Sequence, residues 1–382
     1  MYLNYIRALN SAEDPQGAVE LKNSLEFAID HVGQDMHAGP IWLEYVEFLS
    51  GVKEKTPVYE SVFGKASEGQ QEAAKTAAIR RALHRAIAVP NMMLDELWIF
   101  YERFENSLGN KTLAKRSLDE WRPKYHASKA AFKDRQAVVE ALDVRMLPSP
   151  PGKGGYYQME SANKWRAYYQ FERDNQGESD DATYQARVVL AYEQSLSRLI
   201  HFPDVWLDYA SWHTHGKGNG NEAAVSVLNR GREALPVAIV LHFTAADLEE
   251  SSGNVNRARE IYEELISSPI QDSNGAEDDV EGNKDRNLSS ELKTLAWVQY
   301  MRFVRRCDGL MAARKLFLRA RKWTGLQWQA FVASARFEWA NDGKDHIPRN
   351  IFELGLKSFL KIPGYVLEYA SFLQGMVFLI EI

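Results

Sequence analysis

The sequence is poor in cysteine and in long apolar runs. It has 382 residues and a single cysteine, Cys307. One cysteine excludes an internal disulfide framework and a zinc site built on several cysteines, and it suits a reducing compartment. The N-terminus lacks a basic segment followed by an apolar run, and no stretch reaches the ~20 apolar residues that a membrane-spanning helix needs. We therefore expect an intracellular protein that is neither secreted nor inserted in a membrane.

The sequence also lacks an excess of positive charge. Asp and Glu outnumber Lys and Arg by 52 to 46, which gives a formal net charge of −6. This balance argues against a protein that coats a duplex mainly through phosphate contacts, so any contact with RNA must be a local patch. A hydrophobic content of 45% and an aromatic content of 12% are enough for a substantial core.

Motifs that carry catalysis or bind cofactors are missing as well. The stretch 152–155 (GKGG) lacks the frame of a phosphate-binding loop, and we interpret it as linker. His213 and His215 have no third ligand at metal spacing, so we expect both to be solvated. The aspartate pairs 180–181 and 278–279 do not continue as the DDxxD motif of all-helical terpene synthases. The sequence therefore predicts no enzyme, no cofactor and no metal site.

A repeated aromatic pattern is the main feature that is present. In each copy an aromatic or bulky residue is followed by a second one three positions later and by an aromatic residue or Leu at position six, often with Glu next. The clearest copies start at Trp42, Trp98, Trp165, Trp206 and Trp297, and weaker copies start at His242, Phe331 and Val366. These positions fall on one face of an α-helix, so each copy predicts an amphipathic helix with an aromatic stripe.

The spacing of the copies indicates paired helices. Successive starts are most often separated by about 35 residues, the length of a helix–turn–helix unit. A second column with the same spacing contains Leu83, Tyr192, Leu228, Tyr262, Phe317 and Phe352. We therefore predict an all-α protein, an α-solenoid of helix–turn–helix repeats in two arrays. The signature residues expected in its core are Trp42, Trp98, Tyr101, Trp165, Tyr168, Trp206, Tyr209, Trp297 and Tyr300.

Composition changes along the chain predict its divisions. We expect one array at 1–146, a Pro- and Gly-rich linker at 147–158, a second array at 159–373 and a tail at 374–382 that does not continue the pattern. The linker is interpreted either as a pivot between the arrays or as a plain surface loop. Within the second array, the polar and acidic segment 271–287 is predicted to be disordered. Residues 112–144 are expected to be mostly one helix, interrupted or started near Pro123.

A basic segment runs against the overall acidic balance. Between Arg302 and Lys322 the only acidic residue is Asp308. Two interpretations stay open: the cations form the solvated faces of two antiparallel helices, or they form a docking patch for RNA or an acidic partner. The candidate docking residues are Arg302, Arg305, Arg306, Arg314, Lys315 and Arg319.

Laid out in this way, the repeats resemble half-a-TPR (HAT) repeats, which have a WxxYxxxE-like first helix and a second helix that ends near YERAL. Longer stretches are more specific: 89–98, 297–303 and 351–357 are similar to the suppressor-of-forked family, the HAT-repeat scaffold subunits of cleavage stimulation factor. The resemblance runs from about Tyr2 to Leu373.

The resemblance implies a nuclear, non-catalytic scaffold of the pre-mRNA 3′-end cleavage and polyadenylation machinery. In that family the first array contacts other cleavage and polyadenylation factors, the second forms a homodimer, and the C-terminal tail recruits RNA-binding and WD40 subunits. RNA would be contacted directly or through these partners. Because splicing factors share the generic repeat, a HAT-repeat scaffold in splicing or ribosome biogenesis stays open as an alternative.

Two departures from the family pattern concern the ends. The chain opens inside a first helix at Tyr2, and the tail 374–382 leaves the pattern. We expect the family's earliest repeats and its last dimerising repeats to be missing from this chain. On that basis we expect non-specific association through uncovered apolar faces, and not the family homodimer.

Overall fold

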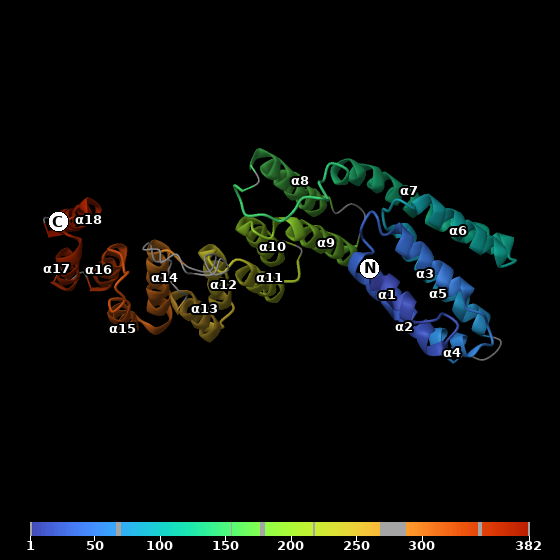
Figure 1. Cartoon of the computed structure of the whole chain (residues 1–382), viewed down its shortest axis with the longest axis horizontal. Coiled ribbons are helices and arrows are strands. Elements are labelled where there is room, and N and C mark those ends of the chain that lie inside the picture. The colour runs from blue at the N-terminus through green and yellow to red at the C-terminus, as the bar shows by residue number, and fades with distance from the viewer. Residues whose placement is uncertain are drawn as a thin grey trace. The chain divides into compact units, whose positions relative to one another are not determined.

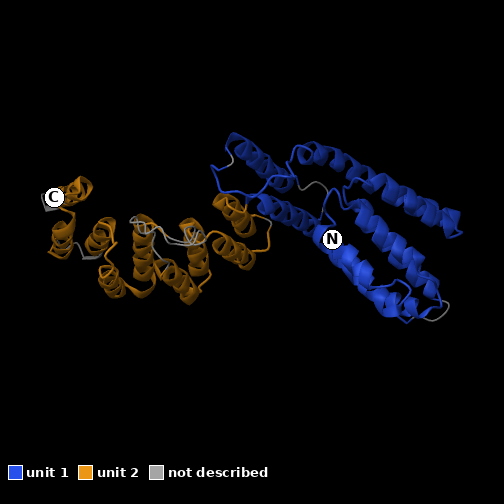
Figure 2. Cartoon of the chain, in the orientation of Figure 1, with its two compact units in different colours: residues 1–199 blue, residues 200–382 orange. Residues whose placement is uncertain are grey.

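The computed structural model describes residues 2–65, 70–153, 155–175, 180–216, 218–267, 288–342 and 346–380. Across these ranges the chain forms α-helices and no strand (Figure 1). The helices fall into two compact units, residues 1–199 and 200–382 (Figure 2). The predicted all-α class is confirmed, and each unit is taken separately below.

Unit 1 contains long helices that pack in pairs. Its helices are α1 (Tyr2–Leu9), α2 (Pro15–Val32), α3 (Gly39–Gly51), α4 (Pro57–Phe63), α5 (Gln71–Ala88), α6 (Leu94–Ser107), α7 (Lys111–Val139), α8 (Gly155–Asp174) and α9 (Asp181–Leu199). Helix α2 packs on α3 and α4, α3 packs on α5, α6 on α7, and α8 on α9.

Unit 2 repeats a helical hairpin. Its helices are α10 (Pro203–His215), α11 (Asn221–Ala234), α12 (Ile239–Ser251), α13 (Val255–Ser267), α14 (Ser290–Asp308), α15 (Leu310–Ala320), α16 (Gln329–Asp342), α17 (His346–Phe359) and α18 (Pro363–Ile380). The hairpins are α10 with α11, α12 with α13, α14 with α15, and α16 with α17. Each first helix also contacts the first helix of the next hairpin, as expected for stacked repeats.

Local sequence signals explain where several helices begin. Asp14, Thr56, Asn110 and Ser289 each accept a hydrogen bond from the backbone N–H three residues later. Such caps satisfy N–H groups that have no partner inside the helix. Pro203 is the first residue of α10, where its missing N–H has no consequence.

Helix α7 runs without a break through Pro123, so the expected interruption or start at that residue is wrong. Pro123 lies on the exposed side of the helix. Its ring leaves the carbonyl of Asp119 without a helical donor, and on an exposed side water can satisfy that carbonyl. The packed opposite side, which includes Leu118, keeps the helix continuous.

The signature aromatic residues form the core. All nine, from Trp42 to Tyr300, are at most 7% exposed. Tyrosines of this set also bond across helices: the hydroxyl of Tyr168 donates to Gln194 at 3.0 Å, and that of Tyr300 donates to Glu263 at 2.7 Å. Full burial of one large apolar side chain stabilises a fold by ~1.5–3 kcal/mol. The signature aromatic residues therefore contribute much of the stability that holds the repeats together.

A buried glutamate follows the aromatic stripe in four repeats, seven residues after its start. The four are Glu105, Glu172, Glu249 and Glu338, each at most 5% exposed. All four pair with arginines of neighbouring helices, as in Glu105 with Arg80 at 2.6 Å. The arginine of Glu249 is more distant, Arg257 at 3.8 Å, and Glu249 also accepts from Asn254 at 2.7 Å. Because a buried carboxylate without a partner is strongly destabilising, these bonds specify which helices pack together.

His213 occupies this same seventh position in the repeat that starts at Trp206, and it is buried. The expectation that His213 is solvated is therefore wrong. Its ring packs against Tyr209 and Trp212, and its Nδ1 accepts the backbone N–H of Asn219 at 3.1 Å. The seventh position of the repeat is buried, and His213 therefore has a structural role. His215, two residues later, is exposed.

Two glycines, each three residues after a member of the second column, allow close approach between helices. A Cβ on Gly231 would lie 3.1 Å from the Trp206 ring, and a Cβ on Gly355 would lie 2.2 Å from the Tyr365 hydroxyl. That hydroxyl donates to the carbonyl of Phe352 at 2.7 Å, so it has little freedom to move.

The predicted divisions of the chain are located as follows. Residues 147–153 lie in the non-helical connection between α7 and α8, whereas the division into two compact units falls between Leu199 and Ile200 in the sequence. The assignment of 147–158 as the linker between repeat arrays stays a prediction. The segment 271–287 lies outside the described residues, and helix α18 continues to Ile380.

No helix among the described residues is long and apolar enough to cross a membrane.

Candidate partner-binding surfaces

The described residues contain no metal site and no activated thiol. No group of three or more His, Cys, Asp or Glu side chains comes together in them as a metal site. Cys307 is exposed, and partial burial together with Glu250 and Asp308 raises the pKa of its thiol. A raised pKa lowers the thiolate fraction, which is the reverse of what a nucleophilic cysteine needs.

Three of the six candidate docking cations are engaged inside the fold. The pairs are Arg306 with Glu250, Arg314 with Glu338, and Arg319 with Glu263, with N–O distances of 2.6 to 2.8 Å. Each joins two helices of unit 2, and each is bidentate, the geometry in which guanidinium binds carboxylate most strongly. Hydrogen bonds from Arg306 and Arg319 lower the pKa values of Glu250 and Glu263 respectively.

The other three candidates are more available. The Arg305 guanidinium lies 5.5 Å from the centre of the Phe337 ring. Arg302 and Lys315 are exposed, and neither forms an ion pair within the described part of the chain. A docking surface therefore stays a prediction for Arg302, Arg305 and Lys315.

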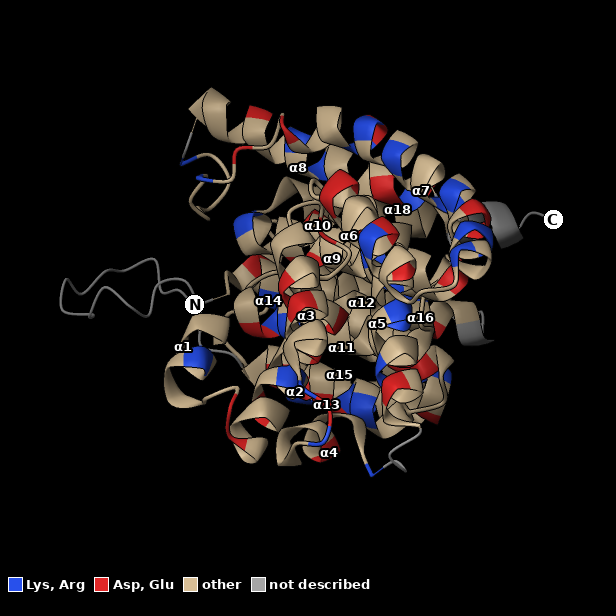
Figure 3. Cartoon of the chain, turned by 90° about the vertical axis from the view of Figure 1, so that its right-hand side faces the viewer, with Lys and Arg blue, Asp and Glu red and all other residues tan. Residues whose placement is uncertain are grey.

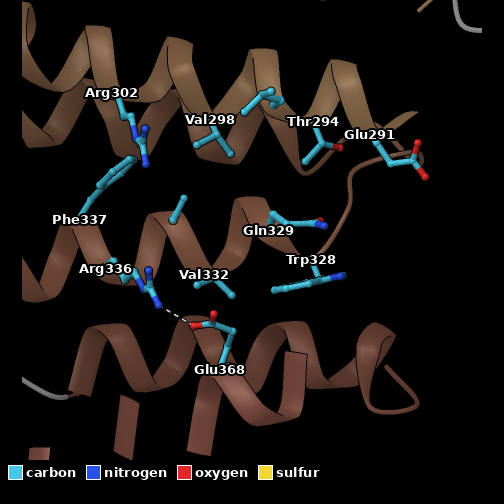
Figure 4. A pocket seen from close by; sticks show the side chains of 12 residues that line it. Glu291, Thr294, Val298, Arg302, Trp328, Gln329, Val332, Arg336, Phe337 and Glu368 are labelled. Atoms are coloured by element: carbon cyan, nitrogen blue, oxygen red, sulfur yellow. Dashed lines mark hydrogen bonds and ion pairs between the residues drawn. The ribbon is translucent and has the colours of Figure 1, made fainter. Parts of the chain in front are cut away.

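Arg302 lies at one end of a groove between α14 and α16 (Figure 4). Val298 and Val332 face into the groove, and Trp328 closes the end away from Arg302. On the rim, Arg336 pairs with Glu368 of α18 at 2.6 Å. The groove offers apolar contact area beside one unpaired cation, which suits the binding of a side chain and not acid–base chemistry.

A buried ionic cluster joins α7, α8 and α9 in unit 1. Glu172 accepts a hydrogen bond from Arg135 at 2.6 Å and forms an ion pair with Arg187 at 2.8 Å, and all three side chains are at most 6% exposed. Arg135 also donates to the carbonyl of Gln34, in the turn between α2 and α3, at 3.4 Å. Burial lowers the pKa of Arg187, and the charge of Glu172 opposes that shift. The cluster thus ties helix pairs on both sides of the 147–153 connection.

His84 lies among α5, α6 and α7. Its ring stacks on Trp121 with 3.7 Å between centroids, and its Nε2 lies 3.0 Å from the Tyr101 hydroxyl. Partial burial and the nearby Arg80 charge lower the pKa of His84 to about 4. The imidazole is therefore neutral near pH 7 and acts as a packing and hydrogen-bonding group.

Comparison with known protein families identifies the family of this chain. The family described as Suppressor of forked protein (Suf) matches residues 1–377. The chain belongs to the Suppressor of forked family. Membership in the Suf family confirms the resemblance found in the aromatic repeats, and it covers both compact units.

Curated Suf-family relatives align along nearly the whole chain. The chain is 33% identical over 375 residues to cleavage stimulation factor subunit 77 of Arabidopsis thaliana. It is 29% identical over 395 residues to the mRNA 3′-end-processing protein rna14 of Schizosaccharomyces pombe, and 26% identical over 422 residues to protein suppressor of forked of Drosophila melanogaster. Each alignment covers 98% of this chain but 46%, 51% and 51% of the respective relative. The chain thus spans about half the length of these relatives.

A solved structure supports the fold. The crystal structure of CstF-77 superimposes with a TM-score of 0.59 at 19% sequence identity, covering 98% of this chain and 69% of that one. At this identity the likeness shows the fold alone. Together with the helix pairs described above, it confirms the predicted solenoid of HAT repeats.

Proposed function

We propose that this chain is a non-catalytic scaffold of the pre-mRNA 3′-end cleavage and polyadenylation machinery, which assembles cleavage stimulation factor through protein–protein contacts in the nucleus. The partners would be other subunits of that machinery. RNA would be contacted directly or through them.

The observation that carries this proposal is the Suf-family match over residues 1–377. The relatives that align along the chain are named for cleavage stimulation factor and for mRNA 3′-end processing. Because the match extends over both units, the similarity to these relatives involves the whole set of repeats and not one short motif.

The chemistry of the side chains agrees with a scaffold. The buried glutamates, arginines and tyrosines of the repeats are used to join helices, as in Glu338 with Arg314. The described surfaces offer grooves and charges, such as the α14/α16 groove beside Arg302, without a metal group or an activated nucleophile. Stacked repeats of this kind present extended surfaces on which several partners can bind at once.

Rapid depletion of the endogenous protein, followed by mapping of RNA 3′ ends, tests the proposal. We expect loss of cleavage at polyadenylation sites and transcripts that extend past them. If 3′ ends stay in place while introns are retained or ribosomal RNA precursors accumulate, the protein serves splicing or ribosome biogenesis, and the proposal is wrong.

A further inference from the structure

Helix α7 carries a line of cations along one exposed side, which we name the α7 stripe. Its members are the cations Lys111, Lys115, Arg122, Lys129 and Lys133, with His126 in line with them. They are spaced 4, 7, 4, 3 and 4 residues apart, which places them on one side of a helix with 3.6 residues per turn. The stripe extends over about 33 Å at 1.5 Å per residue.

The charges of the α7 stripe are largely free of carboxylate partners. Lys129 is the exception, because its ammonium lies 2.7 Å from Asp95 of α6. Lys111, Lys115, Arg122 and Lys133 are exposed and form no ion pair with any described residue. This separates them from the arginines of the 302–322 segment, three of which are saturated by glutamates of neighbouring helices.

Helix α7 itself carries three acidic residues, Asp119, Glu120 and Asp134 (Figure 3, acidic residues in red). By helical periodicity Asp119 lies at the edge of the stripe, whereas Glu120 and Asp134 fall on other sides of the helix. The stripe borders the buried side of the helix, which includes Ala114 and Leu118 and packs into the fold. The cations are therefore held on a rigid, packed helix in a chain whose net charge is −6.

The composition of the stripe favours a phosphate backbone over a protein partner. Protein interfaces are depleted in lysine and depend on buried aromatic or apolar anchors. The stripe is mostly lysine and contains no apolar residue, and the half-exposed Leu113 falls on the opposite side of α7 by helical periodicity. Tyr125, the aromatic residue beside the stripe, is engaged within the fold: its ring stacks on Trp98 with 4.7 Å between centroids, and its hydroxyl donates to Asp95 at 2.6 Å. Trp121 is covered by His84 and by the Lys124 ammonium at 3.9 Å.

We propose that the α7 stripe binds RNA directly through its phosphates, without reading bases. A stripe of about 33 Å can follow a strand of several nucleotides, within the range of single-strand binding sites. The choice of RNA over other phosphate chains rests on the proposed function, whereas the binding of a phosphate chain rests on the charge pattern alone. Because no base is stacked or read, binding is insensitive to sequence and strongly weakened by salt.

The test is fluorescence anisotropy with the whole chain and a labelled, unstructured 20-nucleotide RNA, from 50 to 200 mM salt. The variant Lys111→Glu/Lys115→Glu/Arg122→Glu/Lys133→Glu should bind at least tenfold more weakly at 100 mM salt. Loss of four phosphate contacts should reduce the slope of log K against log salt by about 3, at ~0.7 per contact on a single strand.

A matched control carries the same change of charge elsewhere. Lys53, Lys322, Lys357 and Lys361 are exposed, lie outside α7 and form no ion pair among the described residues. Their reversal to Glu should leave most of the affinity intact. A second stripe variant with Gln at the same four positions preserves helix propensity, and it should also lose binding while the circular dichroism at 222 nm stays unchanged.

Three results would overturn the proposal: a stripe variant that binds RNA like the unaltered chain, a control variant that loses as much affinity, or stripe-dependent binding of polyglutamate without binding of RNA. The last result would identify the α7 stripe as a site for an acidic protein. Since the assay uses purified chain and RNA, its failure leaves the depletion test of the proposed function untouched.

Discussion

Replacement of Glu172 by Ala should loosen unit 1 at the contact of α7, α8 and α9. The carboxylate is 1% exposed and is the shared counter-charge of two buried guanidiniums. Removing it leaves Arg135 and Arg187 as neighbouring cations without their common counter-charge. Loss of one partner from a buried ion pair costs about 3–5 kcal/mol.

Amide hydrogen exchange is the suitable assay, because stacked repeats open locally before the whole chain unfolds. A loss of about 3–5 kcal/mol corresponds to exchange that is on the order of 10²–10⁴ times faster in α8 and in the helices that contact it. Helices of unit 2 should exchange as before.

The same helix supplies the control. Glu160 of α8 pairs with Lys164 at 3.0 Å, but both side chains are more than 40% exposed. Such a surface pair contributes about 0.3–0.5 kcal/mol, so Glu160→Ala should change exchange only slightly. If Glu172→Ala behaves like Glu160→Ala, the cluster does not hold these helices together. Replacing all three members of the cluster by Met should recover much of the stability, since apolar residues of similar volume can substitute for a buried ionic cluster.

Three further predictions follow from the packing. Gly355→Ala should lower the free energy of unfolding by about 1–3 kcal/mol in urea denaturation, because its Cβ meets the tyrosine hydroxyl 2.2 Å away, whereas Gly51→Ala, with nothing within 4 Å, should not destabilise. Arg314→Ala should lower thermal stability by leaving a buried glutamate unpaired, and Lys315→Ala should not; equal effects would contradict the assignment of Arg314 to the fold. His84 has a folded pKa of about 4, below its unfolded value of ~6.5, so the unfolded state binds more protons between these values. Its contribution to stability should be present above pH ~6.5 and should be lost as pH falls toward 4, and a His84→Gln variant should show a shallower decline of the urea midpoint.

The aromatic period allowed the helices and their buried faces to be predicted from sequence, because a stripe at positions 0, 3 and 6 determines which side of a helix is apolar. The residue seven positions after each of the clearest starts is also buried, and this regularity could have been read from the same repeats. It predicts burial of Glu105 and Glu338, and applied to the repeat at Trp206 it also predicts burial of His213.

Pairing between helices could not be predicted in the same way. Arg314 and Lys315 are adjacent cations in the sequence, yet one is bidentate with a glutamate of the next hairpin and the other is exposed. The distinction depends on which helix packs against α15, and charge runs do not encode this. The α7 stripe could have been found from its spacing of 4, 7 and 4, but the continuity of the helix through Pro123 had to be established first.

The central claim is that this chain is part of a scaffold for 3′-end processing. Affinity purification of the full endogenous protein from nuclear extract after RNase treatment, with quantitative mass spectrometry of the captured proteins, tests it most directly. We predict that cleavage and polyadenylation subunits are enriched in stoichiometric amounts and survive the nuclease. Enrichment of spliceosomal or nucleolar proteins in their place would contradict the claim.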